Sequence, residues 1–85
     1  MGDVPGVKPM SDKQLMFSFM SGSEEAFDRL VGRYAAKVTN FIHRQVPNFA
    51  TAEELAQDTF VAVYRKRATF KPGHRFSPWL YKIAI

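Results

Sequence analysis

The segment SEEAFDRLVGRYAAKVTNFIHRQVP, residues 23–47, carries the strongest helical pattern of the chain. Its apolar residues recur at intervals of three and four, the spacing that places side chains on one face of an α-helix. Ser23 is a suitable N-cap, and Glu24 and Glu25 favour the positive end of the helix dipole. Pro47 limits the helix at its other end. We therefore predict a long amphipathic helix with a buried face of Phe27, Leu30, Val31, Tyr34, Val38, Phe41 and Ile42.

The opposite face of this helix is a ladder of cations and one amide: Arg29, Arg33, Lys37, Asn40 and Arg44. Like charges four residues apart repel each other by a few tenths of a kcal/mol, roughly, in each pair. A nearby polyanion would relieve that repulsion. The alternative is an ordinary solvated face, partly neutralised by Glu25 and Asp28.

A shorter helix is predicted to precede it. Ser11 and Gln14 have the spacing of a capping box, and Gly22 supplies a left-handed stop after about eleven residues. The apolar residues between them again follow a helical interval: Leu15, Met16, Phe19 and Met20.

A third helix is predicted to open at a second capping box, Thr51 to Glu54, and to run to about Arg67. At 100° per residue, one side carries the expected core residues Leu55, Ala56, Thr59, Phe60 and Val63. The far side carries Glu54, Gln57, Asp58, Val61 and Arg65. A valine ringed by polar groups is typical of the centre and rim of a small protein interface. A solvated face with a single chance valine is the alternative.

After a turn-forming loop at residues 71–75, Ser77 and Pro78 predict a fourth helix, with the serine as cap and the proline at the first helical position. The free amides at its start, beside His74 and Arg75, offer a seat for a phosphate, although capping by Ser77 alone would also satisfy them. The chain stops about two turns later, so we expect this sequence to be part of a longer protein. Residues 11–85 are thus predicted to be an all-α domain, a compact bundle of three helices plus a short, truncated fourth, behind a disordered tail at residues 1–10.

Charge is divided unevenly along the chain. Residues 1–58 hold six Lys or Arg and all eight acids, whereas residues 59–85 hold six Lys or Arg and no acid. The same final segment holds six of the twelve aromatic residues. Cations interleaved with flat rings are suited to neutralising phosphates and stacking on bases, unless the rings belong to the core and the charges to the solvated surface. Phe70 and Phe76 leave both possibilities open, and for Phe76 and Trp79 we favour the core.

Several functional classes are disfavoured. Without cysteine the chain has no disulfide or thiolate metal site, and His43 and His74 have no ligand at a metal-binding spacing. No nucleophile elbow or phosphate-binding glycine loop is present, so we expect neither an enzyme nor a cofactor. The longest apolar run, residues 60–64, is far short of the roughly 20 residues needed to cross a bilayer. We expect no membrane insertion and a cytoplasmic location.

Three stretches closely resemble region 2 of bacterial extracytoplasmic-function (ECF) sigma factors: SGSEEAF at 21–27, AEELAQDTFVAVYR at 52–65 and FSPWLYKIA at 76–84. The resemblance covers about residues 11–84. It implies an all-helical domain that binds the β′ clamp helices of RNA polymerase core and recognises and melts the promoter −10 element. The family continues beyond Ile-Ala in a longer helix and has a second, −35-reading module, which supports the expectation of a longer parent protein.

The resemblance also implies site residues. The polymerase-binding motif falls on Glu54, Gln57 and Asp58, with Val61 and Arg65 alongside. The family's promoter-reading loop and helix fall on the basic aromatic segment. Together they imply contacts with the non-template DNA strand, which is expected to be single-stranded. The residues expected to make these contacts are Lys66, Arg67, Phe70, Lys71, His74, Arg75, Ser77, Tyr81 and Lys82. An anti-sigma factor is a further expected partner. Two alternatives remain: an interaction module bound by such a regulator without productive DNA engagement, and a basic nucleic-acid binder without sequence preference.

Overall fold

The computed structural model describes residues 10–85, which form four α-helices and one short 3₁₀-helix and contain no strand. The helices are α1 (Asp12–Met20), α2 (Glu24–His43), α3 (Phe49–Arg65) and α4 (Phe76–Ala84), and η1 (Arg67–Thr69) lies between α3 and α4. The predicted all-α bundle of three helices and a short fourth is confirmed. The disordered tail predicted for residues 1–10 lies outside the described residues except for Met10, which is half-buried against the core.

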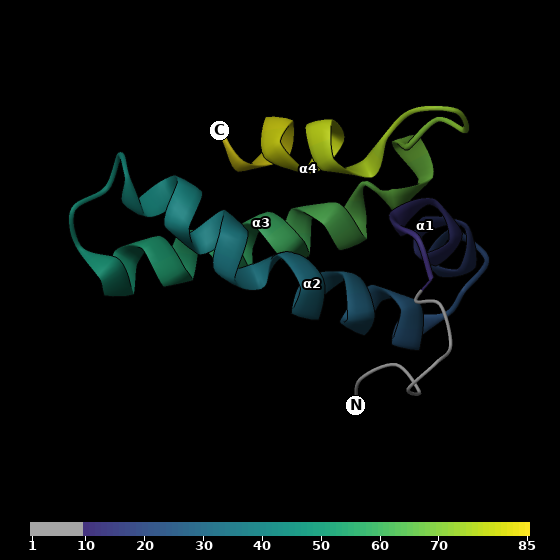
Figure 1. The fold of residues 1–85 in the computed structure, drawn as a ribbon, viewed down its shortest axis with the longest axis horizontal. Helices are drawn as coiled ribbons and strands as arrows, with labels where there is room; N and C mark the ends of the chain where they lie inside the picture. Colours follow the sequence, from purple (N-terminus) through teal and green to yellow (C-terminus); the bar gives the residue numbers. More distant parts are fainter. Residues whose placement is uncertain (1–9) are drawn as a thin grey trace.

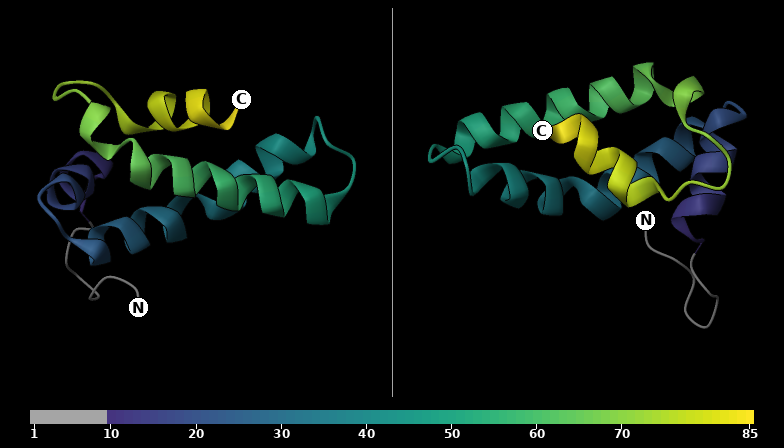
Figure 2. Two further views of the ribbon diagram at one scale, coloured as in Figure 1. Left: turned by 180° about the vertical axis from the view of Figure 1, so that it is seen from behind. Right: turned by 90° about the horizontal axis from the view of Figure 1, so that it is seen from above.

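The two long helices α2 and α3 run antiparallel and form the body of the domain (Figure 1). α1 packs across the end of this pair where α2 begins and α3 finishes, and α4 turns back to cover one face of it (Figure 2). The chain between α3 and α4 therefore lies at the same end of the molecule as α1. All four helices contribute to a single core, whose most deeply buried large side chains are Leu15, Met16, Phe19, Leu30, Val38, Val63 and Leu80.

The starts of α1 and α2 agree with the predicted caps. The Gln14 amide donates to Ser11 Oγ at 3.1 Å, and the Ser11 amide donates to Gln14 Oε1 at 2.8 Å, which completes the capping box. Ser23 Oγ accepts from the Ala26 amide at 3.1 Å. Between the two helices Gly22 has a φ of +109°, a conformation that only glycine adopts without strain, so the tight turn depends on it.

The starts of α3 and α4 differ from the prediction. α3 begins at Phe49 because Asn48 is its N-cap, with Asn48 Oδ1 accepting from the Thr51 amide at 3.0 Å. Thr51 therefore lies inside the first turn. α4 begins at Phe76 after Arg75, and no side chain caps it. Ser77 and Pro78 are thus the second and third helical residues, and the proline is still tolerated because the first four amides of a helix have no intrahelical acceptor.

The buried face of α3 also differs in one residue. Leu55, expected in the core, is 40% exposed, whereas Ala52 is fully buried. The remaining expected core residues of α3, namely Ala56, Thr59, Phe60 and Val63, are buried as predicted. On α2, Phe27, Val31 and Phe41 are half-buried at the edges of the core rather than inside it.

A polar cluster ties α1 to α2. Arg33 Nη1 donates to Asp12 Oδ1 at 2.9 Å, and the Tyr34 hydroxyl donates to the other Asp12 oxygen. Burial, reinforced by the hydrogen bond to Asp12, raises the pKa of Tyr34 to about 12. Because one carboxylate serves two donors, the cluster fixes both the position and the rotation of α1 against α2.

This cluster predicts the effect of Asp12→Asn. The substitution should lower the free energy of unfolding by about 2 kcal/mol, since it removes an ion pair and weakens a hydrogen bond in a partly buried setting. The pKa of Tyr34, followed by ultraviolet absorbance, should fall towards its ordinary value. In the unsubstituted protein, the stability linked to ionisation of Tyr34 should be fully present below about pH 10. It should decline as the pH rises from about 10 towards 12, because the tyrosine of the unfolded chain ionises first. Urea unfolding at several pH values would check this, and an unchanged tyrosine titration would contradict it.

Candidate functional site

The five residues predicted to bind polymerase lie along the outer side of α3. Glu54, Gln57, Asp58, Val61 and Arg65 are all exposed, and we call this set the α3 stripe. Val61 is 48% exposed, a high value for a large apolar side chain within a packed helix. Helical spacing gives the stripe carboxylates and an amide at one end, a valine near its centre and a guanidinium at the other end. The stripe thus has the composition expected of a small protein interface.

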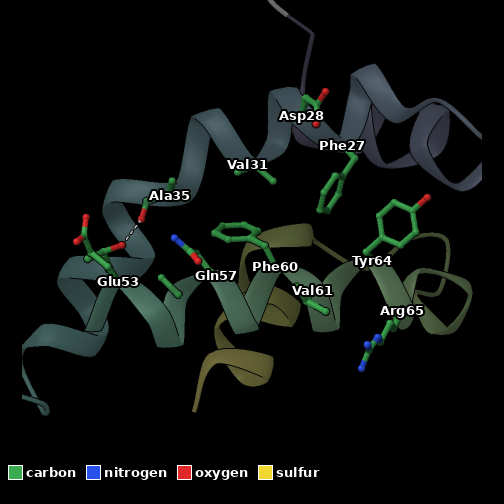
Figure 3. A pocket seen from close by; sticks show the side chains of 12 residues that line it. Phe27, Asp28, Val31, Ala35, Glu53, Gln57, Phe60, Val61, Tyr64 and Arg65 are labelled. Atoms are coloured by element: carbon green, nitrogen blue, oxygen red, sulfur yellow. Dashed lines mark hydrogen bonds between the residues drawn. The ribbon is translucent and has the colours of Figure 1, made fainter. Parts of the chain in front are cut away.

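A groove runs beside the α3 stripe, between α2 and α3, with a volume of about 520 Å³. Its floor is apolar, formed by Phe27 and Val31 of α2 and by Phe60 of α3. Figure 3 shows Gln57, Phe60 and Tyr64 on the side of α3 that faces α2, whereas Val61 and Arg65 point away from α2. The groove and the stripe therefore join into one surface with an apolar centre and a polar rim.

Three rings hold one end of the groove in shape. The ring centroids of Phe19 and Phe27 are 4.9 Å apart, and those of Phe27 and Tyr64 are 5.1 Å apart with an edge-to-face geometry. The Tyr64 hydroxyl donates to the Glu24 carboxylate, and this hydrogen bond raises the pKa of Tyr64. α1, α2 and α3 meet at this point, so the position of the stripe relative to α2 is well determined.

The predicted DNA-binding cations fall mostly in the α3–α4 loop, residues 66–75. Lys66, Lys71, His74 and Arg75 are exposed. No acid occurs between residues 59 and 85, so no carboxylate of this segment offsets the charge of the two lysines and Arg75. Gly73 has a φ of +91°, which allows the tight turn that precedes His74 and Arg75. The loop is thus a concentrated positive surface at the end of the molecule that also carries α1.

Arg67 is placed differently from the other loop cations. Its guanidinium carbon lies 4.6 Å from the centroid of the Tyr64 ring and 5.7 Å from that of Phe19. Its Nη1 donates to the Tyr64 carbonyl at 2.7 Å. The half-buried side chain is therefore engaged within the fold, and the DNA contact expected from Arg67 stays a prediction.

Phe70 is placed in the core as well. It is only 7% exposed, and its ring meets the Trp79 ring edge-to-face at 5.2 Å. Phe76 is also buried, beside Tyr34 at 5.4 Å. Of the two roles left open for Phe70, stacking on a base or sealing the loop onto the core, the structure shows the second.

A cavity of about 470 Å³ lies between α1 and the α3–α4 loop, and the sequence predicted a site on its loop side but none on α1. Phe17 and Met16 of α1 line one side, and Pro72 and His74 of the loop line the other. Phe17 is 74% exposed. The sequence did carry a sign of this cavity, because Phe17 lies off the apolar face of α1. It is a large ring that the helix does not use for its own packing.

The remaining predicted residues lie on α4. Ser77 and Tyr81 are half-buried, and Lys82 is exposed in the last turn. The Tyr81 ring meets Phe41 of α2 edge-to-face at 5.0 Å. No side chain caps the start of α4, so its first amides face the region of His74 and Arg75 without a side-chain acceptor.

Metal-binding clusters and membrane-spanning helices are both absent from residues 10–85. Within that part of the chain no group of three or more His, Cys, Asp or Glu side chains is arranged to hold a metal ion. No helix there is both long enough and apolar enough to traverse a bilayer.

Comparison with known proteins places this geometry in a family. The family model for sigma-70 region 2 matches residues 30–85. The chain is 46% identical over 69 residues to the RNA polymerase sigma factor CarQ of Myxococcus xanthus, covering 81% of this chain and 40% of that protein. It is 33% identical over 76 residues to the ECF RNA polymerase sigma-E factor of Escherichia coli, covering 89% of this chain and 39% of that protein. The chain thus spans about two fifths of the length of these relatives.

A solved structure is similar over most of the fold. An engineered region 2 of sigmaE, determined by NMR in complex with GTAAAA, matches with a TM-score of 0.82 and 35% sequence identity. The match covers 88% of this chain and 78% of that one. The resemblance seen in the three sequence stretches is therefore confirmed, and the chain belongs to the sigma-70 region 2 family, in its extracytoplasmic-function branch.

Proposed function

We propose that this chain is the part of a sigma factor that docks on RNA polymerase core and recognises and melts the promoter −10 element. The observation that carries the proposal is the close match to a region 2 whose structure contains the oligonucleotide GTAAAA. Such a domain is a binding module rather than an enzyme, and it acts in the cytoplasm, where the polymerase is. The α3 stripe and the α3–α4 loop are the two surfaces that this function requires.

Docking is assigned to the α3 stripe and the adjoining groove, and the partner to the clamp helices of the β′ subunit. An exposed valine beside an apolar groove supplies area that association can desolvate. The carboxylates of Glu54 and Asp58 and the amide of Gln57 surround it and can pair with cationic or polar groups on a partner helix. An anti-sigma regulator would use the same surface, because any helix that fills the groove excludes the polymerase from it.

Recognition of the −10 element is assigned to the loop and to the cavity beside α1. Lys71, His74 and Arg75 contact phosphates of the non-template strand, joined by Lys66 and by Ser77, Tyr81 and Lys82 of α4. A base flipped out of the duplex enters the cavity, where Phe17 supplies the ring face that the buried Phe70 does not. Unstacking costs a few kcal/mol, roughly, and stacking on an aromatic side chain returns about 1–3 kcal/mol per base, so phosphate contacts must supply the remainder.

The polymerase surface is tested by the double substitution Gln57→Ala and Asp58→Ala. Affinity for core polymerase should fall about tenfold or more if these side chains are among the few residues near the centre that dominate binding, since tenfold corresponds to about 1.4 kcal/mol. Helicity should stay unchanged because both side chains are exposed. Biolayer interferometry with immobilised core polymerase would measure the decrease, and Glu25→Ala, an exposed acid on α2, is the matched control. Wild-type affinity in the double variant would remove this assignment.

The phosphate contacts are tested by Lys71→Ala and Arg75→Ala. Each should weaken binding to a fluorescent −10 oligonucleotide and reduce the salt slope of log K by about 0.7 to 1 unit, the value expected when one phosphate is no longer neutralised. Fluorescence anisotropy across a salt series is the measurement, and Arg29→Ala on α2 is the control. If the slopes match those of the unsubstituted chain, these side chains are only solvated.

The base-binding cavity is tested by Phe17→Ala. Because the ring is largely exposed, thermal stability should change little, whereas affinity for a −10 single strand should fall by about 1–3 kcal/mol if one base stacks on it. Phe17→Tyr, which keeps the ring, should bind normally.

A permuted oligonucleotide separates the proposed function from that of a basic binder without sequence preference, for which both sequences would bind equally. A chain that binds core polymerase or a regulator but no −10 strand would instead be an interaction module.

A further inference from the structure

A second positive surface lies away from the α3–α4 loop, where the latter half of α2 meets α4. A shallow pocket of about 460 Å³ opens there, lined by Lys37, Asn40, Phe41 and Arg44 of α2 and by Tyr81 of α4. Lys37, Asn40 and Arg44 are exposed, as is Lys82, the neighbour of Tyr81. We call Lys37, Asn40, Arg44, Tyr81 and Lys82 the α2–α4 patch.

The charges of this patch are not neutralised within the described part of the protein. Earlier on the same face of α2, Arg29 pairs with Glu25 at 3.8 Å, and Arg33 pairs with Asp12 at 2.9 Å. Among residues 10–85, no carboxylate forms an ion pair with Lys37, Arg44 or Lys82. The Lys37 ammonium lies over the Tyr34 ring instead, 5.4 Å from its centroid. Within the described residues, ion pairs thus offset the charges of Arg29 and Arg33 in the first half of this face, whereas Lys37 and Arg44 in its second half have no carboxylate in an ion pair.

The rings of this patch favour phosphates over bases as its ligand. Phe41 and Tyr81 pack edge-to-face against each other and are half-buried, so neither is a fully exposed ring of the kind that stacks on a base. What remains accessible is two ammonium groups, a guanidinium, an amide and a phenol. These groups contact the sugar-phosphate backbone of nucleic acid without reading its sequence.

The α2–α4 patch lies a short distance from the α3–α4 loop. Arg75 and Lys82 are seven residues apart along α4, about 10 Å at 1.5 Å per residue. One strand of duplex DNA carries a phosphate about every 3.4 Å along the axis, so about three phosphates separate the two surfaces. A strand that leaves the loop therefore reaches the patch almost at once.

We propose that the α2–α4 patch binds the phosphate backbone of the duplex DNA that adjoins the melted −10 element. The inference rests on the function proposed above, because it takes the single strand to lie at the loop. It adds α2, through Lys37, Asn40 and Arg44, to the DNA-binding surface, and it places the contacts of Tyr81 and Lys82 where the non-template strand leaves the melted segment and enters the duplex. By holding the duplex where strand separation begins, the patch supplies electrostatic attraction that offsets part of the cost of unstacking.

The test compares two fluorescent probes bound by the 85-residue chain. One is the single strand GTAAAA, and the other is the same strand joined to a short duplex. For Lys37→Gln/Arg44→Gln, affinity for the joined probe should fall and its salt slope should decrease by about 1.8 units, about 0.9 for each duplex phosphate that is no longer neutralised. Binding to the single strand should stay unchanged. Arg29→Gln, on the same helix but paired with Glu25, is the matched control, and Lys37→Arg/Arg44→Lys should bind as the unsubstituted chain does.

Two results would overturn the proposal. One is a double variant whose slope and affinity for the joined probe equal those of the unsubstituted chain, which would leave the patch to an acidic protein partner or to solvent. The other is an equal decrease on both probes, which would mean that the two cations serve the single strand. Failure of the proposed function has a different signature, since the unsubstituted chain would then bind GTAAAA no better than a permuted strand. Circular dichroism and thermal unfolding of each variant confirm that the fold is retained.

Discussion

The close approach of α3 to the rest of the bundle is the contact on which the other features depend. Ala52, Ala56 and Val63 are almost completely buried, and the small alanine side chains allow the backbones of neighbouring helices to come near. Once these three residues face inward, the rotation of α3 about its axis is determined. Glu54, Gln57, Asp58, Val61 and Arg65 then have to face outward, because a helix advances by about 100° per residue. The surface assigned to polymerase is thus a direct consequence of how the core packs.

The sequence was sufficient for features that repeat along a helix, and less so for those decided by a single neighbour. The outward side of α3 followed from periodicity alone, as did most of its core. The start of α3 was misplaced because Asn48 and Thr51 are both good caps, and only the fold shows that Asn48 accepts the hydrogen bond. Leu55 was wrongly placed in the core because the helical periodicity gives the direction of a side chain from the helix axis. It does not say where the neighbouring helices end.

Loop residues were harder to assign, since their surroundings come from distant parts of the chain. Arg67 and Phe70 are residue types that suit a nucleic-acid surface, and both lie within a basic segment. Both are nevertheless engaged inside the domain. The rings that hold Arg67 belong to α1 and α3, and the ring beside Phe70 belongs to α4. Conversely, Phe17 is 53 residues before Phe70 in sequence and joins the same cavity. Composition indicated a segment, but tertiary contacts decide which side chains in it are free.

The two tyrosine–carboxylate hydrogen bonds connect this packing to the surfaces that we propose for DNA. Tyr34 with Asp12 fixes α1 on α2, and Tyr64 with Glu24 fixes α3 on α2. α1 forms one wall of the cavity and the chain that leaves α3 forms the other, so both walls are positioned relative to the same long helix. α2 also carries two of the three cations of the α2–α4 patch, Lys37 and Arg44. A disturbance at either tyrosine would therefore change the spacing between the cavity and the patch, and so the fit to the DNA strand that we propose to cross both, even though neither hydroxyl lies on the proposed path.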